Sequence, residues 1–262
     1  MSKVVAIIPA RYASSRFLGK PLALLKGQPM VAWVIQRCLQ VKAFANVIVA
    51  TDDERIAQVA QHAGAEAVMT HSNHASGSDR VWEAASDLPD AEIIVNVQGD
   101  EPFINPDELS QLVTLLTTNA VSADVATMIC PITDVEEFNN PNIVKAVVAK
   151  DNKVLYFSRS PIPFHRQSQQ DNAPLGYRHI GVYAYRRDAL QAFVKQPMTT
   201  LEQTECLEQL RGLHYGLTYI ALIVPKAPIG VDTPEDLQRL EDEACLETSF
   251  TKSTSSVTTR GA

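Results

Sequence analysis

The sequence predicts an α/β fold with a Rossmann-like, mostly parallel central sheet and a β-rich inserted subdomain. In the first half of the chain, apolar strand runs alternate with helical patterns, which is typical of consecutive βαβ units. Helix-start signals follow several runs, as at Asp53 and at the Asn105-Pro106 pair, where side-chain oxygens and a proline suit a first helical turn. From residue 140 to 185, strand runs surround a long polar stretch that contains proline, and this change predicts the insert.

Each expected strand is a short apolar run, and each expected helix is a longer periodic segment. In the first half, strands are expected at residues 4–8, 46–50, 67–69, 93–97 and 125–129, and helices near 29–42, 53–63, 78–87 and 106–119. In the insert, strands are expected at 144–148, 154–157 and 180–185, around a loop at 158–177. A helical segment at 200–211, a strand at 219–223 and a helix after Thr233-Pro234 complete one domain, 1–247. The Ser/Thr-rich segment 248–262 is expected to be a disordered tail.

The composition is that of a globular chain with an acidic charge balance. The chain has 262 residues, 45% of them hydrophobic, and a formal net charge of −7. Broad binding to nucleic acid or to an anionic membrane is therefore not expected, because both partners need a basic surface. No apolar run approaches the roughly 20 residues that span a bilayer, so we expect a cytoplasmic location. The four cysteines are widely separated without a CxxC pair, which favours reduced thiols over disulfides or zinc.

The opening run IIPARYASSRFLGKPL, residues 7–22, leads from an apolar strand into a loop that carries Arg11, Arg16 and Lys20. Open α/β sheets bind ligands beyond the carboxyl ends of their strands, and three cations there favour a polyanion such as a nucleoside triphosphate. The Walker A pattern and the GxGxxG fingerprint are both absent, which argues against P-loop ATPases and dinucleotide-dependent oxidoreductases. On its own, the loop fits a solvated basic segment with salt bridges about equally well.

Two acidic motifs favour the phosphate interpretation. The run VNVQGDEP, residues 95–102, places Asp100 after an apolar strand, at the same sheet edge as the basic loop. The run GVDTPEDL, residues 230–237, places Asp232 just before a helix. Mg²⁺ prefers oxygen ligands and is often held by one or two carboxylates together with phosphate and water. Each aspartate alone could equally be a helix cap.

These three motifs and five further runs resemble the 3-deoxy-manno-octulosonate cytidylyltransferases, also called CMP-KDO synthetases. The further runs are ASGSDR (75–80), NPNIVK (140–145), LYFSRSPIPF (155–164), RHIGVYAY (178–185) and LEQLR (207–211). The resemblance extends from about residue 4 to 240. It implies a nucleotidyltransferase fold and a reaction in which the anomeric hydroxyl of an eight-carbon acidic sugar attacks the α-phosphorus of CTP. The expected products are a CMP-sugar for lipopolysaccharide synthesis and pyrophosphate.

The resemblance also implies roles for individual residues. Asp100 and Asp232 are expected to hold Mg²⁺ and, with Arg11 and Lys20, to be catalytic. The nucleotide contacts that it implies are Ala10, Arg11, Ser15, Arg16, Lys20 and Arg80. The sugar contacts that it implies are Gln98, Arg159, His179, Tyr183, Glu208 and Gln209, and Arg80 also falls in a motif that suits the sugar. Members are commonly dimeric, so we expect a homodimer with the insert at its interface.

Several of these residues have a purely structural alternative. Arg159 could pair with a carboxylate, Tyr183 could belong to a surface face of a strand, and His179 could be a packing residue. His71 and His74 have a ligand-like spacing, but they lie in a polar loop without a nearby cysteine. A solvated loop is the preferred interpretation for these two histidines.

Departures from the family pattern leave the sugar open. Phe17-Leu18-Gly19 stands where Leu-Pro-Gly is typical, SGSDR at 76–80 stands where SGTER is common, and Gln203 stands where relatives often have histidine. If the segment around Gln203 reaches the sugar, the preferred acid could differ, and 8-amino-3,8-dideoxy-manno-octulosonate is the alternative substrate. Two other classes remain as alternatives: a CMP-sialic acid synthetase, which shares the opening loop, and a noncatalytic nucleotide-binding regulator, which would be expected to lose the metal carboxylates.

Overall fold

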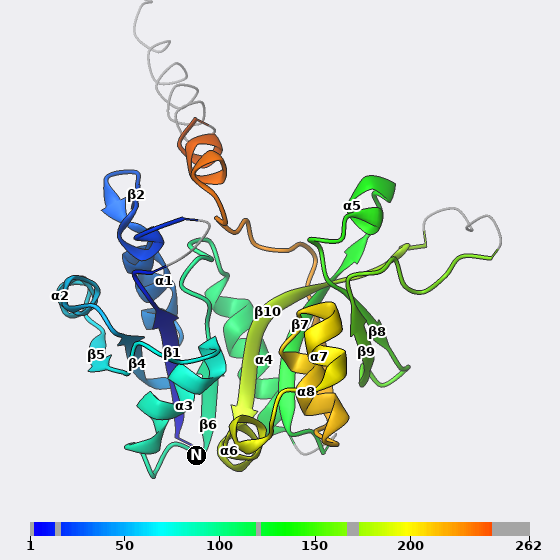
Figure 1. The fold of residues 1–262 in the computed structure, drawn as a ribbon, viewed down its shortest axis with the longest axis horizontal. Helices are drawn as coiled ribbons and strands as arrows, with labels where there is room; N and C mark the ends of the chain where they lie inside the picture. The colour runs from blue at the N-terminus through cyan, green and yellow to red at the C-terminus, as the bar shows by residue number, and fades with distance from the viewer. Residues whose placement is uncertain (1–2, 14–16, 119–121, 167–172, 243–262) are drawn as a thin grey trace, which may run out of the picture.

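A nine-stranded sheet is the centre of the protein in a computed structural model that describes residues 3–13, 17–118, 122–166 and 173–242. Across the sheet, the seven main strands are β11 (Tyr219–Ile223), β7 (Val125–Ile132), β10 (Gly176–Arg186), β6 (Ile93–Asn96), β1 (Val4–Ala10), β4 (Phe44–Thr51) and β5 (Glu66–Met69). A hairpin of β8 (Lys145–Val148) and β9 (Val154–Ser158) joins the sheet through β10 (Figure 1).

All neighbouring pairs among these seven strands are parallel except the two that involve β10. The predicted α/β fold with a mostly parallel sheet is therefore confirmed. From β1 the chain passes through α1 (Met30–Leu39) to β4 on one side, and it returns after β5 through α3 (Gly77–Ser86) to β6 on the other. This reversal beside β1 creates a crevice at the carboxyl ends of β1 and β6, where such sheets bind ligands.

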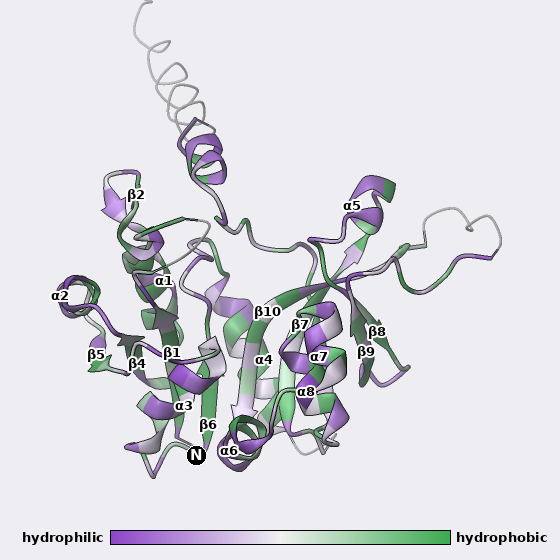
Figure 2. Cartoon of the chain, in the orientation of Figure 1, coloured by the Kyte–Doolittle hydropathy of each residue, from purple (hydrophilic) through white to green (hydrophobic). Residues whose placement is uncertain are grey.

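Helices cover both faces of the sheet because its buried strands are apolar on both sides. Val4, Ala6 and Ile8 of β1 pack with α1, α2 (Glu54–His62) and α4 (Pro106–Thr117). Val5 and Ile7, which alternate with them, pack with α3, α6 (Arg187–Lys195) and α8 (Gln209–His214). Strands β6 and β7 are largely hydrophobic in Figure 2. Full burial of each aliphatic side chain contributes about 1.5–3 kcal/mol.

Strand β10 connects the insert with the main sheet. Its first half, at Tyr177 and Arg178, pairs with β8, and its second half, from Tyr183, pairs with β6. Between them, the register against β7 shifts from Ile180 to Tyr183, an irregularity that bends the strand. The strand expected at 180–185 is thus longer, and it is a central strand of the sheet as well as the end of the predicted insert.

Some elements differ from the sequence-based expectation. The helix expected over 200–211 is two helices, α7 (Thr200–Glu205) and α8, because Cys206 adopts a left-handed conformation with φ of 50°. Thr199 caps α7 in a capping box with the buried Glu202, whose carboxylate accepts hydrogen bonds from Arg211 of α8 at 2.5 and 2.8 Å. The elements not anticipated are η1 (Lys20–Leu22), β2 (Leu24–Leu25), β3 (Gln28–Pro29), α5 (Val135–Asn139) and α6.

Residues 234–242 are helical, as expected. The segment expected to be a disordered tail, 248–262, lies outside the described residues, as does the end of the predicted domain at 247. Across the ranges that the structure describes, none of the helices has the length and apolar character needed to cross a membrane.

A buried lysine joins the hairpin to the loop before it. Lys145 Nζ donates hydrogen bonds to the carbonyl oxygens of Asn140 at 2.8 Å, Ile143 at 2.7 Å and Arg159 at 2.8 Å. Burial lowers the pKa of this ammonium, with a further contribution from the nearby positive charge of Arg159. The three hydrogen bonds offset the cost of desolvating the charge and fix two loops on either side of the hairpin.

We predict that Lys145→Met lowers the free energy of unfolding by roughly 2–4 kcal/mol, because it leaves three carbonyl groups without their donor. Urea denaturation followed by circular dichroism measures the effect. Lys153→Met, in the same hairpin but with an exposed side chain, is the matched control and is expected to change little. Equal effects of the two substitutions would contradict the structural role of Lys145.

Candidate active site

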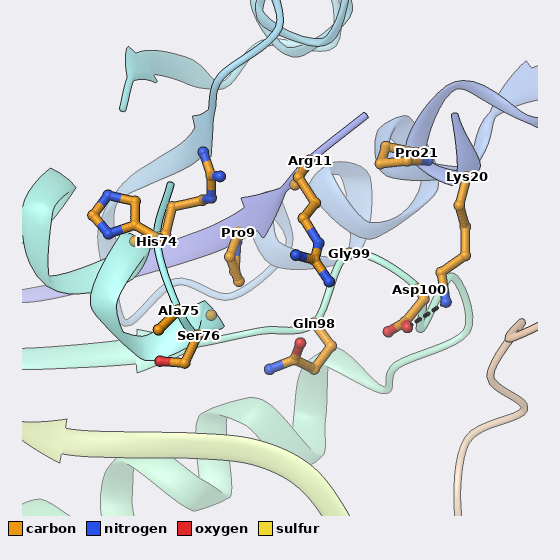
Figure 3. Close-up of a pocket in the computed structure, with 13 residues that line it drawn as sticks. Pro9, Arg11, Lys20, Pro21, His74, Ala75, Ser76, Gln98, Gly99 and Asp100 are labelled. Atoms are coloured by element: carbon orange, nitrogen blue, oxygen red, sulfur yellow. Dashed lines mark hydrogen bonds and ion pairs between the residues drawn. The ribbon is translucent and has the colours of Figure 1, made fainter. Parts of the chain in front are cut away.

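A pocket opens beyond the carboxyl ends of β1 and β6 (Figure 3). Four segments form it: the end of β1, the η1 turn, the start of α3 and the chain after β6. The residues that line it are Pro9, Ala10, Arg11, Lys20, Pro21, His74, Ala75, Ser76, Gly77, Arg80, Gln98, Gly99 and Asp100. The predicted opening loop and the predicted acidic motif therefore lie at one site, as expected from the sheet.

Lys20 occupies the centre of the charged end of this pocket. Its Nζ donates to Asp100 Oδ2 at 2.6 Å and to Asp232 Oδ1 at 3.4 Å. The lysine side chain is only 14% exposed, whereas those of Asp100 and Asp232 are 31% and 57% exposed. Two carboxylates from distant parts of the sequence thus share one cation.

The turn before Lys20 requires glycine. Gly19 has a φ of 69°, and its amide donates to the carbonyl oxygen of Tyr12 at 2.9 Å. A Cβ at this position would lie 2.9 Å from the Tyr12 ring, which itself stacks against the Arg55 guanidinium 3.8 Å from its centroid. The Tyr12 ring and the left-handed turn together set the position from which Lys20 reaches the carboxylates.

The C-terminal segment brings Asp232 to the site. In Figure 1 it passes from the side of β7 toward the helix above β2. The Val231 amide donates to the carbonyl oxygen of Asp100 at 3.0 Å, and its side chain packs with Leu25, Met30 and Leu240. This small apolar cluster holds the segment in place, so the proximity of Asp232 to Asp100 depends on packing as well as on charge.

The other end of the pocket is the first turn of α3. Ser76 caps this helix, and Asp79 completes the capping box. The buried Arg80 donates to Thr70 Oγ1 at 2.5 Å and lies 3.4 Å from Asp52 Oδ2. Its guanidinium therefore holds the wall of the pocket together, and a direct nucleotide contact from it stays a prediction. Arg11 projects into the pocket in Figure 3.

Ala10 lines the pocket as expected for a nucleotide contact, whereas the predicted contacts Ser15 and Arg16 lie outside the described residues.

Gln98 lies between this pocket and β10. Its amide nitrogen donates to Asn96 Oδ1 at 3.3 Å, and a Cβ at Gly181 of β10 would lie 3.9 Å from its Cγ. The absence of a side chain at Gly181, within the bend of β10, leaves room beside Gln98. This residue is therefore placed to contact two ligands that meet at the end of the sheet.

Of the two predicted sugar contacts on β10, His179 is buried and Tyr183 is half-buried. His179 Nε2 lies 2.9 Å from Thr127 Oγ1, and its ring contacts those of Phe157 and Tyr183 at centroid distances of 4.7 and 5.4 Å. Burial lowers the pKa of His179 to about 3, so the ring is neutral at physiological pH. Burial also raises the pKa of Tyr183 well above its ordinary value, which keeps its hydroxyl protonated.

Glu208 and Gln209 lie near the start of α8, and Gln209 is buried. Burial raises the pKa of Glu208, while the hydroxyls of Ser76 and Ser78 on α3 act in the opposite direction. Its Oε1 is buried and has no hydrogen-bond partner among the described residues. A carboxylate oxygen in this state can accept a hydrogen bond from a ligand hydroxyl.

Arg159 has a structural role, but its side chain binds backbone carbonyl groups and not the carboxylate that the structural alternative expected. Its side chain donates to the carbonyl oxygens of Glu205 at 2.7 Å, Pro141 at 3.0 Å and Cys206 at 3.3 Å. The Glu205 carboxylate instead accepts from the Arg159 amide at 2.9 Å and from the Ser158 hydroxyl at 2.6 Å. Arg159 and Glu205 thus join the end of β9 to α7, and a sugar contact from Arg159 stays a prediction.

Glu101, which follows Asp100, has a buried carboxyl group that the sequence did not single out. Its Oε2 is buried without a hydrogen-bond partner among the described residues. Burial, with the adjacent Asp100 charge as the second cause, raises the pKa of Glu101 to about 8. The adjacent Asp100 and Glu101 of the VNVQGDEP motif were a sequence signal for this raised pKa, because two neighbouring carboxyl groups do not readily both ionise.

The donor set at Lys20 fits a hard divalent cation. Asp100 and Asp232 offer carboxylate oxygens, and both already lie against one positive charge, that of the Lys20 ammonium. Mg²⁺ takes such oxygen ligands and completes its shell with water and phosphate oxygens.

The sequence is similar to those of known proteins over most of its length. A family model described as cytidylyltransferase matches residues 5–221. The 3-deoxy-manno-octulosonate cytidylyltransferase of Cellvibrio japonicus is 48% identical over 246 residues, which cover 90% of this chain and 95% of the relative. That of Alteromonas mediterranea is 46% identical over 242 residues, covering 89% and 96%. The 8-amino-3,8-dideoxy-manno-octulosonate cytidylyltransferase of Shewanella pealeana is 44% identical over 240 residues, covering 91% and 97%.

Solved structures share the fold. A CMP:2-keto-3-deoxy-manno-octonic acid synthetase complexed with CTP superimposes with a TM-score of 0.87 at 42% identity, covering 94% of this chain and 100% of that one. The 4-diphosphocytidyl-2C-methyl-D-erythritol synthase of Anaerococcus prevotii superimposes with a TM-score of 0.61 at 14% identity, covering 93% and 96%. The second match extends the likeness in fold alone to a more distant enzyme.

We predict that His179 makes the fold sensitive to acid. The pKa of the folded ring is about 3 and its ordinary value is 6.5, so the unfolded chain binds a proton first as the pH falls. Stability from this residue is complete above pH 6.5 and is lost below it, by about 2 kcal/mol between pH 7.5 and 5. His179→Gln should show a smaller loss over this range in urea denaturation.

The exposed His62 of α2 supplies the control, because His62→Gln should leave the pH dependence of unfolding unchanged. If the wild-type chain and His179→Gln lose equal stability between the two pH values, a neutral buried His179 is excluded.

Proposed function

Because the chain belongs to the 3-deoxy-manno-octulosonate cytidylyltransferase family, we propose that it transfers the CMP group of CTP to an eight-carbon acidic sugar and releases pyrophosphate. The sugar is 3-deoxy-manno-octulosonate or its 8-amino analogue, the two acids for which its relatives are named. The observation that carries the proposal is the convergence of Lys20, Asp100 and Asp232 at the pocket beside β1. The chain is thus a nucleotidyltransferase.

The triphosphate of CTP would lie between the opening loop and the first turn of α3. Arg11 and Lys20 supply positive charge there, and the positive end of the α3 dipole favours a phosphate group. Arg80 holds this wall in place through Thr70 and Asp52. The arrangement fixes the phosphates before the reaction, so that less ordering is needed as charge develops.

Asp100 and Asp232 would hold Mg²⁺. When bound, the ion would neutralise charge on the triphosphate and lower the pKa of the attacking hydroxyl, which removes the need for a separate general base. The Lys20 ammonium would move from the two carboxylates to a phosphate oxygen. The Mg²⁺ ion would then replace the ammonium as the cation beside the carboxylates, and the Lys20 ammonium would pair with the leaving pyrophosphate.

The sugar would occupy the side of the pocket toward β10. Glu208 offers an unpartnered carboxylate oxygen to a sugar hydroxyl, and Gln98 lies where the sugar and the nucleotide would meet. Among the described residues, three of the five N–H groups of Arg159 donate to carbonyl oxygens, which leaves two for the sugar carboxylate. His179 and Tyr183 form the buried side of this subsite, and Gln209 lies next to Glu208.

The cellular role follows from the chemistry of the product. A CMP-octulosonate is an activated sugar for lipopolysaccharide synthesis, and CTP is available in the cytoplasm, where we place the reaction. We also propose a homodimer with the region 140–185 at its interface. A sedimentation experiment that gives only monomer at working concentration would contradict the dimer.

The substrate proposal is tested by pyrophosphate release with CTP, Mg²⁺ and each of three acids: 3-deoxy-manno-octulosonate, its 8-amino analogue and N-acetylneuraminate. We expect release with an octulosonate, recorded continuously because the products hydrolyse. Release with N-acetylneuraminate alone would assign the chain to CMP-sialic acid synthesis. Binding of CTP without release with any acid would favour a noncatalytic nucleotide-binding protein.

We predict that Asp100→Asn and Asp232→Asn each lower kcat by at least about 10³-fold, because each removes a charge from the cation site. Folding should be preserved, since both side chains are partly exposed. The exposed Asp90, before the amino end of β6, gives a matched control, because Asp90→Asn should retain full activity. Near-normal turnover in either site variant would remove that aspartate from the catalytic site.

A further inference from the structure

A second group of possible metal ligands lies at the outer rim of the pocket. It consists of His71 and His74, in the loop between β5 and α3, and Glu83 on α3. His71 Nδ1 lies 2.6 Å from Glu83 Oε1, and His74 Nε2 contacts Glu83 Oε2. One ligand atom from each residue lies within 4.8 Å of the other two. Within the ranges that the structure describes, no other group of three such residues meets this spacing.

We propose that His71, His74 and Glu83 bind a transition-metal ion of the Zn²⁺ class, at a site distinct from Asp100 and Asp232. Two imidazoles and one carboxylate are the donor set of many three-ligand zinc sites, in which a fourth position stays open. Mg²⁺ is a poor competitor for this set, because it prefers oxygen ligands and does not readily take imidazole. The two sites thus differ in the metal that they select.

The side chains are already arranged for a shared ion. The two imidazole rings are nearly perpendicular, at 84°, with centroids 6.4 Å apart, and each directs one nitrogen at the Glu83 carboxylate. The His71 amide also donates to Glu83 Oε2 at 3.0 Å, which fixes the carboxylate. Tetrahedral zinc with bonds near 2.0–2.1 Å needs ligand atoms about 3.3 Å apart, which small side-chain rotations can reach.

The surroundings leave a coordination position open. His71, His74 and Glu83 line a shallow hollow together with Asp79, Trp82, Ser86 and Val194. The His71 side chain is 80% exposed, so an ion can enter from solvent, whereas those of His74 and Glu83 are 18% and 27% exposed. Water or an exogenous ligand would fill the fourth position.

The site is connected to the nucleotide pocket through His74, which lines both hollows. In Figure 3, His74 lies at the opposite end of the pocket from Lys20, next to Ala75 and Ser76. An ion held here would tie the loop before α3 to the body of that helix. The ion would therefore stabilise the pocket wall against which the triphosphate is proposed to lie, and it would take no part in the reaction.

The test uses Co²⁺, whose visible absorption is intense in tetrahedral sites and weak in octahedral oxygen sites. The full-length chain without an affinity tag is stripped of metal and titrated with Co²⁺ in excess Mg²⁺. We expect one equivalent with the intense spectrum, displaced by Zn²⁺. His71→Ala, His74→Gln and Glu83→Gln should each weaken this binding at least about tenfold.

Three controls identify the ligands. His62→Ala removes an exposed histidine elsewhere, Asp100→Asn alters the proposed Mg²⁺ site, and Cys206→Ser removes an exposed thiol. None of them should change the Co²⁺ spectrum. His71→Ala keeps the proposal testable if another variant fails to fold, because the His71 side chain is largely in solvent. An unchanged spectrum in His71→Ala, a thiolate-to-cobalt charge-transfer band, or no intense spectrum at all would overturn the proposal.

Discussion

The shared ion pair of Lys20 with Asp100 and Asp232 is the interaction on which the active site depends. The three residues come from the opening loop, the end of β6 and the C-terminal segment, and 80 and 212 positions separate the lysine from its two partners. Without a cation between them, the two carboxylates would repel each other at the edge of the pocket. The ammonium therefore holds the site together before any ligand binds. The apolar cluster of Val231 with Leu25, Met30 and Leu240 adds the contacts that hold the C-terminal segment.

The same arrangement prepares the exchange of charge that nucleotidyl transfer requires. Two carboxylates that are held together by an ammonium can accept a divalent ion when that ammonium transfers to a phosphate group, so each charge keeps a partner throughout. Two buried groups near the site, Glu101 and His179, have pKa values that keep them uncharged at pH 7, so neither adds a competing charge to the reacting groups.

The sequence predicted the parallel strands and the two halves of the charged site, because short apolar runs and charged strand ends are local signals. It did not predict that β10 is a central strand, because its pairing with β6 and β7 joins residues far apart in the chain. The sequence also did not predict which side chains pair with one another in the folded chain. The carbonyl clamp of Arg159 and the grouping of Glu83 with His71 and His74 depend on how loops pack, which no spacing in one segment encodes.

A crystal structure of the protein with CTP and Mn²⁺ would locate the proposed ion by anomalous scattering. Mn²⁺ prefers the same oxygen ligands as Mg²⁺. We expect an anomalous peak between Asp100 and Asp232, with Lys20 moved onto the triphosphate. A peak elsewhere on the nucleotide, with Lys20 still bonded to both aspartates, would exclude this arrangement.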